Sequence, residues 1–114
     1  MVTLPAKLKD TSPTRKKRVR SDAHLKWVRS HRCCVPGCER VPIEAAHVRS
    51  GLPEGEQPGL GMKPGDNWTI SLCSEHHRQQ HEVGETTFEG WHGIDMRALA
   101  QEFAKRSPHR NKLR

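Results

Sequence analysis

The chain has 114 residues, of which only 32% are hydrophobic, with two Phe and no Tyr. This length and composition predict a single domain with a thin core, which a metal or disulfides would have to reinforce. No apolar run approaches the roughly 20 residues that cross a bilayer, and the N-terminus lacks the apolar centre of a secretion signal. We therefore expect a cytoplasmic protein without a membrane partner.

The net charge of +7 is concentrated at the N-terminus. Residues 1–22 carry seven basic and two acidic side chains, whereas the remainder carries 13 basic and 11 acidic ones. Such a segment is either a solvated, disordered leader or an arm that neutralises the phosphates of a nucleic acid, and both can hold at once. We predict a disordered basic tail over residues 1–20, in which Lys16, Lys17 and Arg18 contact nucleic acid.

A helix and a tight turn are predicted next. Residues 21–31 read as a short helix that Ser21 or Asp22 can cap. Residues 33–38 (CCVPGC) predict a tight turn, because the Pro-Gly pair sets one φ and permits a positive φ at the next position.

Two strands joined by a long loop are predicted for the middle of the chain. Residues 40–48 are compatible with a short strand, and residues 50–66 are a Gly- and Pro-rich loop without periodicity. Residues 68–73 predict the clearest strand, because apolar side chains alternate there with the polar Thr69 and Ser71.

Two helices are predicted in the last third. Residues 74–82 form the first, with Ser74 as its cap and Gly84 as its stop. The second is an amphipathic helix over residues 95–106, capped by Asp95 and ended by a proline. Its apolar stripe, which we expect in the core, consists of Met96, Leu99 and Phe103. We place one domain at residues 21–107 and a basic C-terminal tail at residues 108–114.

The cysteines have the spacing of a zinc site. Two ligands from a turn and two from the start of a helix commonly build a tetrahedral zinc centre. Cys38 with either Cys33 or Cys34 supplies the first pair, with Cys33 preferred, and Cys73 with His76 supplies the second. The alternative interpretation is a set of buried structural cysteines with histidines on the surface.

Three histidines outside this ligand set are further candidates for chemistry. His77 and His81 are four residues apart, so they share one face of a helix and can clamp a second divalent ion; the alternative is a pair of solvated histidines. His76 is rotated about 100° from His77 and can face the zinc instead. His47 lies at the end of the first predicted strand, and a neutral imidazole beside a metal-bound phosphate can deprotonate water.

These residues occur in a familiar order. The pattern C-x4-C, A-H-V, an Asn before a strand and then L-C-x2-H-H-x3-H resembles the HNH nucleases of the ββα-metal superfamily, and among them small phage- and prophage-borne enzymes of the YbcO kind. The resemblance covers residues 21–92, with its core at 33–81. It implies an α+β fold, namely a small ββα-metal core with a zinc knuckle and flanking helices.

The resemblance also implies roles for individual residues. His47 would be the general base, Asn67 would orient it by holding the loop between the strands, and His77 with His81 would ligate one catalytic Mg²⁺ or Mn²⁺ ion. Arg49 and Arg78 would contact phosphate. The structural zinc would be held by Cys33, Cys38, Cys73 and His76.

The implied activity is metal-dependent endonucleolytic hydrolysis of DNA, without a small-molecule substrate and with a homodimer as an open option. One position departs from the family, because Ala46 stands where many members carry an extra metal ligand, which predicts weaker metal binding before DNA arrives. The alternative function is a catalytically inactive zinc-knuckle module that binds DNA or RNA.

Overall fold

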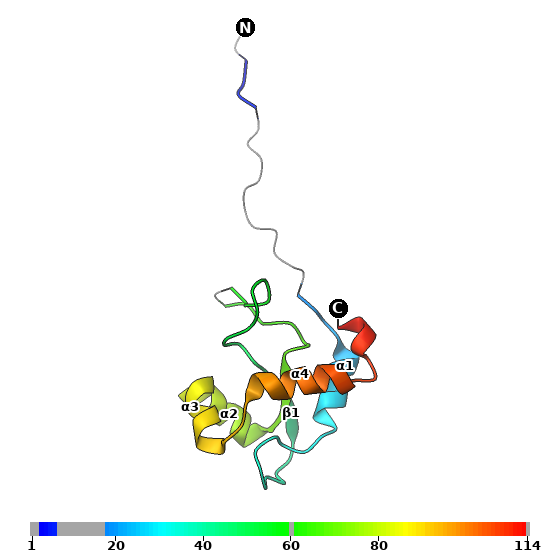
Figure 1. Ribbon diagram of the computed structural model, residues 1–114, viewed down its shortest axis with the longest axis vertical. Helices are drawn as coiled ribbons and strands as arrows, with labels where there is room; N and C mark the ends of the chain where they lie inside the picture. Colours follow the sequence, from blue (N-terminus) through cyan, green and yellow to red (C-terminus); the bar gives the residue numbers. More distant parts are fainter. Residues whose placement is uncertain (1–2, 7–17, 60, 114) are drawn as a thin grey trace.

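The computed structural model describes residues 3–6, 18–59 and 61–113 (Figure 1). Over these residues the chain forms a small α+β structure with four α-helices and one two-stranded antiparallel sheet. None of the described helices is long and apolar enough to cross a membrane. The elements in chain order are α1 (Asp22–Arg29), β1 (Ile43–His47), β2 (Thr69–Cys73), α2 (Ser74–Val83), α3 (Glu85–His92), α4 (Met96–Arg106) and the 3-10 turn η1 (Arg110–Lys112).

The two strands pair in a register that runs from Ile43 opposite Cys73 to His47 opposite Thr69. The predicted loop between them contains no helix or strand among its described residues. All five residues of β2 are buried, including the polar ones that alternation would place at a solvent face. Their hydroxyls are satisfied internally: Thr69 Oγ1 donates to the carbonyl of Asp66 at 2.9 Å and Ser71 Oγ to that of Arg32 at 2.7 Å.

The helices cover the hairpin. In Figure 1, α4 crosses the centre of the molecule, with α2 and α3 on one side and α1 on the other. The largest side chains without solvent exposure include Phe88, Ile70, Leu72 and Met96. Helix α3, which supplies Phe88, was not predicted from the sequence. It follows α2 directly because Gly84, at φ 86°, turns the chain between the two helices.

Side-chain caps explain where three helices begin. Ser21 caps α1 and accepts from the His24 amide at 3.2 Å, and Asp95 caps α4 as predicted. The prediction that Ser74 caps α2 is wrong. Cys73 is the N-cap of α2, and its sulfur accepts from the His76 amide at 3.4 Å. Ser74 is instead the first helical residue.

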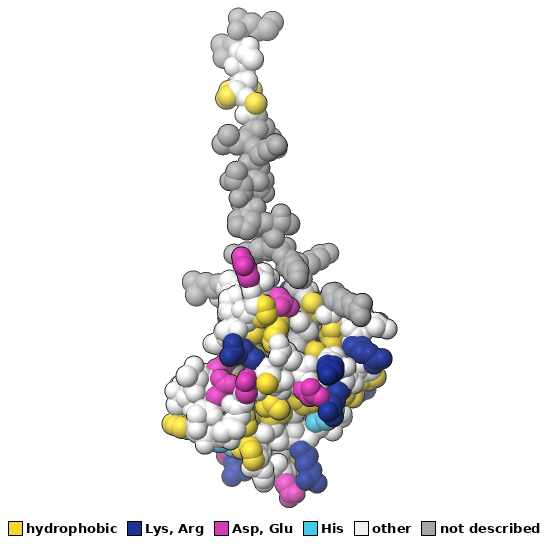
Figure 2. All heavy atoms as spheres, viewed as in Figure 1, with side chains coloured by type: hydrophobic (Ala, Val, Ile, Leu, Met, Phe, Trp, Pro, Cys, Tyr) yellow, Lys and Arg dark blue, Asp and Glu magenta, His cyan; other side chains and the backbone are white. Residues whose placement is uncertain are grey.

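The C-terminal residues return to α1. The segment predicted as a basic tail contains η1, and Leu113 beyond it is 9% exposed. Just before this segment, Ser107 Oγ lies 2.8 Å from Nδ1 of the fully buried His24. On the face that Figure 2 shows, basic side chains lie beside acidic ones, so no patch of one sign covers that face.

Candidate functional site

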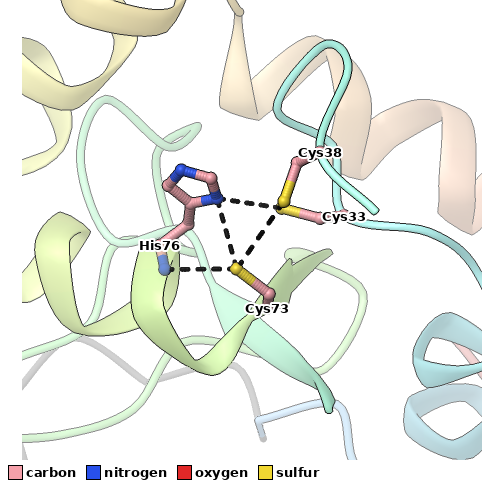
Figure 3. Close-up of side chains that lie close together, drawn as sticks. All are labelled: Cys33, Cys38, Cys73 and His76. Carbon is pink, nitrogen blue, oxygen red and sulfur yellow. Dashed lines mark hydrogen bonds between the residues drawn. The ribbon is translucent and has the colours of Figure 1, made fainter. Parts of the chain in front are cut away.

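Three cysteines and one histidine form a cluster between the knuckle of residues 33–38 and the start of α2 (Figure 3). One ligand atom from each of these four residues lies within 4.8 Å of all the others. The Sγ atoms of Cys38 and Cys73 are 3.9 Å apart, and His76 Nδ1 lies 3.4 Å from Cys33 Sγ and 3.2 Å from Cys73 Sγ. The cluster joins segments separated by about 40 positions in the sequence.

These distances fit a tetrahedral metal centre. Zinc bonds of about 2.3 Å to sulfur and about 2.0 Å to nitrogen separate two sulfurs by about 3.8 Å and a sulfur from a nitrogen by about 3.5 Å. The cluster can therefore hold a metal ion, and its Cys3His donor set is compatible with structural zinc. Cys34 is not part of the cluster, because its sulfur lies 3.4 Å from Ser71 Oγ.

Local backbone geometry places the ligands. Gly37 has φ 77°, and the Cys38 amide donates to the Val35 carbonyl at 3.0 Å, which closes the predicted turn. The Cys34 amide donates to the Ser71 carbonyl at 2.8 Å and so ties the knuckle to β2. Cys73 ends β2 and caps α2, which brings His76, one turn later, to the same point.

Burial affects the protonation of these ligands. It raises the pKa of the Cys33 thiol to about 11, so a metal must displace a proton from this sulfur at neutral pH. Burial, followed by the nearby His92 and Arg40, lowers the pKa of His76. The imidazole is therefore already in the neutral form that binds metal.

A second cluster lies where α2 runs along β1. His77 Nε2 is 3.1 Å from His81 Nε2, and His77 Nδ1 is 2.8 Å from a carboxylate oxygen of Glu44 in β1. The hydrogen bond from His77 is the main cause that lowers the pKa of Glu44. Because the ionised carboxylate only accepts, Nδ1 of His77 is the donor in this hydrogen bond, and the lone pair of a neutral imidazole then lies on Nε2, the atom next to His81. We call Glu44, His77 and His81 the histidine clamp.

His47 lies at the end of β1 with its side chain 19% exposed. Its Nε2 is 2.9 Å from Oδ1 of Asp66, a loop residue whose side chain is 5% exposed. Burial is the main cause that lowers the pKa of His47, and the hydrogen bond with Asp66 partly opposes it. Over the described part of the chain, no contact joins the His47 ring to either imidazole of the clamp. Gln80, between His77 and His81 on α2, reaches the His47 carbonyl at 3.5 Å.

The remaining predicted site residues are held by neighbouring groups. Asn67 lies next to Asp66 but contacts Glu56, at 3.4 Å, rather than His47. The Arg49 guanidinium donates to the Met62 carbonyl at 2.9 Å, and the exposed Arg78 lies 3.9 Å from Glu82. Arg18 lies 3.5 Å from Asp66. Lys16 and Lys17 fall outside the described residues.

Sequence reasoning missed Glu44 and Asp66. Each is an acidic residue whose histidine partner lies far along the chain, 33 positions away for Glu44 and 19 for Asp66. The available signals were weak: Glu44 stands in the same short strand as His47, and Asp66 precedes the predicted Asn67 by one residue. Only the pairing of β1 with β2 and the path of α2 bring these carboxylates to their imidazoles.

Comparison with known proteins gives a match to one family model. Residues 11–108 match the family model described as "Protein of unknown function (DUF968)". No curated protein and no solved structure matches the chain. Because the matched region spans most of the sequence, this chain belongs to the DUF968 family.

Proposed function

We propose that the protein is a metal-dependent endonuclease of the HNH, or ββα-metal, type that hydrolyses DNA phosphodiester bonds. The observation that carries the proposal is the clamp, in which two imidazole nitrogens lie 3.1 Å apart and a carboxylate orients one of them. A strand–strand–helix unit that bears such a clamp beside a Cys3His cluster is the arrangement that the resemblance implies.

The clamp fits a divalent ion. Two nitrogens bound at about 2.0–2.1 Å lie about 2.9 Å apart at a right angle and about 3.4 Å apart at the tetrahedral angle, which brackets the observed separation. Glu44 supports His77 as outer carboxylates support metal-bound histidines in general. Imidazole ligands favour Mn²⁺ over Mg²⁺, which prefers oxygen, so we expect Mn²⁺ to be the better cofactor. Ala46 offers no ligand atom, so among these residues His77 and His81 would hold the ion.

The chemistry divides between the ion and the side chains. The bound ion supplies charge stabilisation for the phosphate and for the leaving 3′-oxygen. His47, neutral at pH 7 because burial lowers its pKa, accepts a proton from the attacking water. The water oxygen bonds to phosphorus, the bond from phosphorus to the 3′-oxygen breaks, and the 3′-oxygen takes up a proton from solvent. Arg49 and Arg78 contact the phosphate once they leave their present partners.

The second candidate is a zinc-knuckle module that binds DNA or RNA without cutting it. Two observations favour it: Ala46 removes a metal ligand, and the His47 ring has no contact with the clamp in the described structure. The basic N-terminal residues serve either function equally well. The catalytic test therefore has to separate binding from cleavage.

The test is nicking of supercoiled plasmid by the zinc-loaded protein with Mn²⁺ or Mg²⁺, with and without EDTA. We expect His47→Ala to lower single-turnover cleavage about 10²–10⁴-fold while DNA binding persists, and excess Mn²⁺ not to restore it. His81→Ala and Glu44→Gln weaken the ion site, so excess Mn²⁺ should partly restore both. His109→Ala is the matched control, because that ring lies outside both clusters. Nicking by His47→Ala and His81→Ala at the control rate would assign the activity to a contaminant and favour the binding module.

A further inference from the structure

We propose that Asp66 is the positioning residue for His47: it fixes the imidazole so that Nδ1 is the proton-accepting atom. Arg18 neutralises the carboxylate at Oδ1, the same oxygen that His47 contacts. This inference rests on the proposed function, in which His47 is the base. It replaces Asn67, which the resemblance implied for orienting His47, with the acidic residue beside it. We call Asp66 and His47 the dyad.

The Asp66 side chain has little freedom to move. Oδ1 meets His47 Nε2 at 2.9 Å, and Oδ2 accepts from the Ser21 amide at 2.8 Å. Its backbone is held as well, because its amide donates to the Val19 carbonyl at 2.9 Å and its carbonyl accepts from Thr69 Oγ1 at 2.9 Å. Both carboxylate oxygens and both backbone groups of Asp66 thus have hydrogen-bond partners, and the side chain is only 5% exposed. A carboxylate held this firmly sets the orientation of the ring it contacts.

The hydrogen bond determines the tautomer. An ionised carboxylate only accepts, and neutral imidazole carries one N–H, so the proton of His47 lies on Nε2. The lone pair then lies on Nδ1, which becomes the atom that takes a proton from water. When His47 gains that proton, the adjacent carboxylate stabilises the imidazolium, as in the Asp–His pairs of hydrolases.

Arg18 links the dyad to the basic N-terminal segment. Its Nη1 lies 3.5 Å from Asp66 Oδ1 and 3.4 Å from the Pro64 carbonyl, and its side chain is 26% exposed. The charged groups that act on His47 are therefore Asp66, which raises the pKa of the imidazole, and Lys63 and Arg18, which lower it. Burial lowers the pKa of His47 by more than any one of these three charges shifts it. Removing Asp66 or Arg18 should move the pKa of His47 in opposite directions.

The experiment is NMR of the full-length, zinc-loaded protein with ¹⁵N-labelled histidine, which reads tautomer and pKa without any cleavage. In the unsubstituted protein we expect the Nε2–H tautomer for His47. Asp66→Asn should lower the pKa of His47, and Arg18→Gln should raise it. Asp22→Asn and Arg20→Gln are the matched controls, because they make the same charge changes at exposed residues nearby and should leave the pKa where it is.

Cleavage provides the second measurement. Asp66→Asn should lower single-turnover plasmid cleavage by about 10²-fold or more with Mn²⁺ affinity unchanged, since the ion is held elsewhere. An Nδ1–H tautomer in the unsubstituted protein would overturn the inference, and that spectrum needs no variant that folds poorly. Equal His47 pKa values in Arg18→Gln and Arg20→Gln would also overturn the role of Arg18. If the tautomer and both shifts appear but His47→Ala cleaves normally, the dyad stands and the proposed nuclease function fails.

Discussion

Replacement of Cys38 by Ser tests whether the Cys3His cluster holds the fold together. Cys38 is half-buried, whereas Cys33 and Cys73 are buried, so exchanging sulfur for oxygen here removes little packing. Any loss of stability in Cys38→Ser therefore reflects loss of metal binding rather than loss of core packing. Cys34→Ser is the matched control, because Cys34 is adjacent to the ligand Cys33 yet contacts Ser71.

The magnitude follows from the ligand set and the size of the domain. Structural zinc sites bind with about 10–16 kcal/mol, which at micromolar free zinc stabilises the folded state by about 2–8 kcal/mol. A domain of this size has about 5–14 kcal/mol of total stability, so the metal supplies a large share of it. With about 4–8 °C of Tm per kcal/mol, loss of the metal should lower Tm by at least about 8 °C or abolish the cooperative transition.

Elemental analysis and thermal melts by circular dichroism check this expectation. The unsubstituted protein and Cys34→Ser should each carry about one zinc per chain and melt within a few degrees of one another. Cys38→Ser should carry much less zinc and melt at least about 8 °C lower, and a strong chelator should bring the unsubstituted protein to the same state. A metal-free protein that keeps the same cooperative melt would refute the reasoning, as would zinc loss in Cys34→Ser alone.

Two further predictions concern charge. Deleting residues 1–17 removes five basic residues and one acidic residue while keeping Arg18. The salt dependence of DNA binding, measured by fluorescence anisotropy, should therefore become shallower, while single-turnover cleavage stays unchanged. An unchanged salt dependence would show that these residues do not contact DNA. Burial lowers the pKa of His24, so at acidic pH the folded state binds fewer protons than the unfolded state. The neutral His24 ring therefore contributes fully to the unfolding free energy above about pH 6.5, and this contribution is lost as the pH falls. In urea titrations with excess zinc, His24→Gln should therefore flatten the decline of unfolding free energy below about pH 6.5 by up to about 1.4 kcal/mol per pH unit. An unaltered slope would rule out this role.

Local features of the chain were predictable because their determinants lie a few residues apart. Ser21 and Asp95 precede the helices that they cap, the Pro-Gly pair predicts the knuckle turn, and the spacing of His77 and His81 places both on one helical face. The exact cap residue was harder to predict. Cys73 rather than Ser74 caps α2, because the Cys73 sulfur at the end of β2 accepts from the His76 amide. The missed helix α3 has Phe88 as its one buried side chain, too weak a periodic signal to recognise.

Contacts between distant segments were decided only by the tertiary structure. Cys33 rather than Cys34 joins the metal cluster because the backbone of Cys34 is tied to β2, which turns the two neighbouring sulfurs in different directions. Glu44 and Asp66 acquire their roles from partners 33 and 19 positions away, and the sequence offers only weak local signals for either residue. Spacing along a sequence predicts which groups share a helix face or a turn, whereas the partner of a buried charge depends on which strands pair and where a helix crosses them.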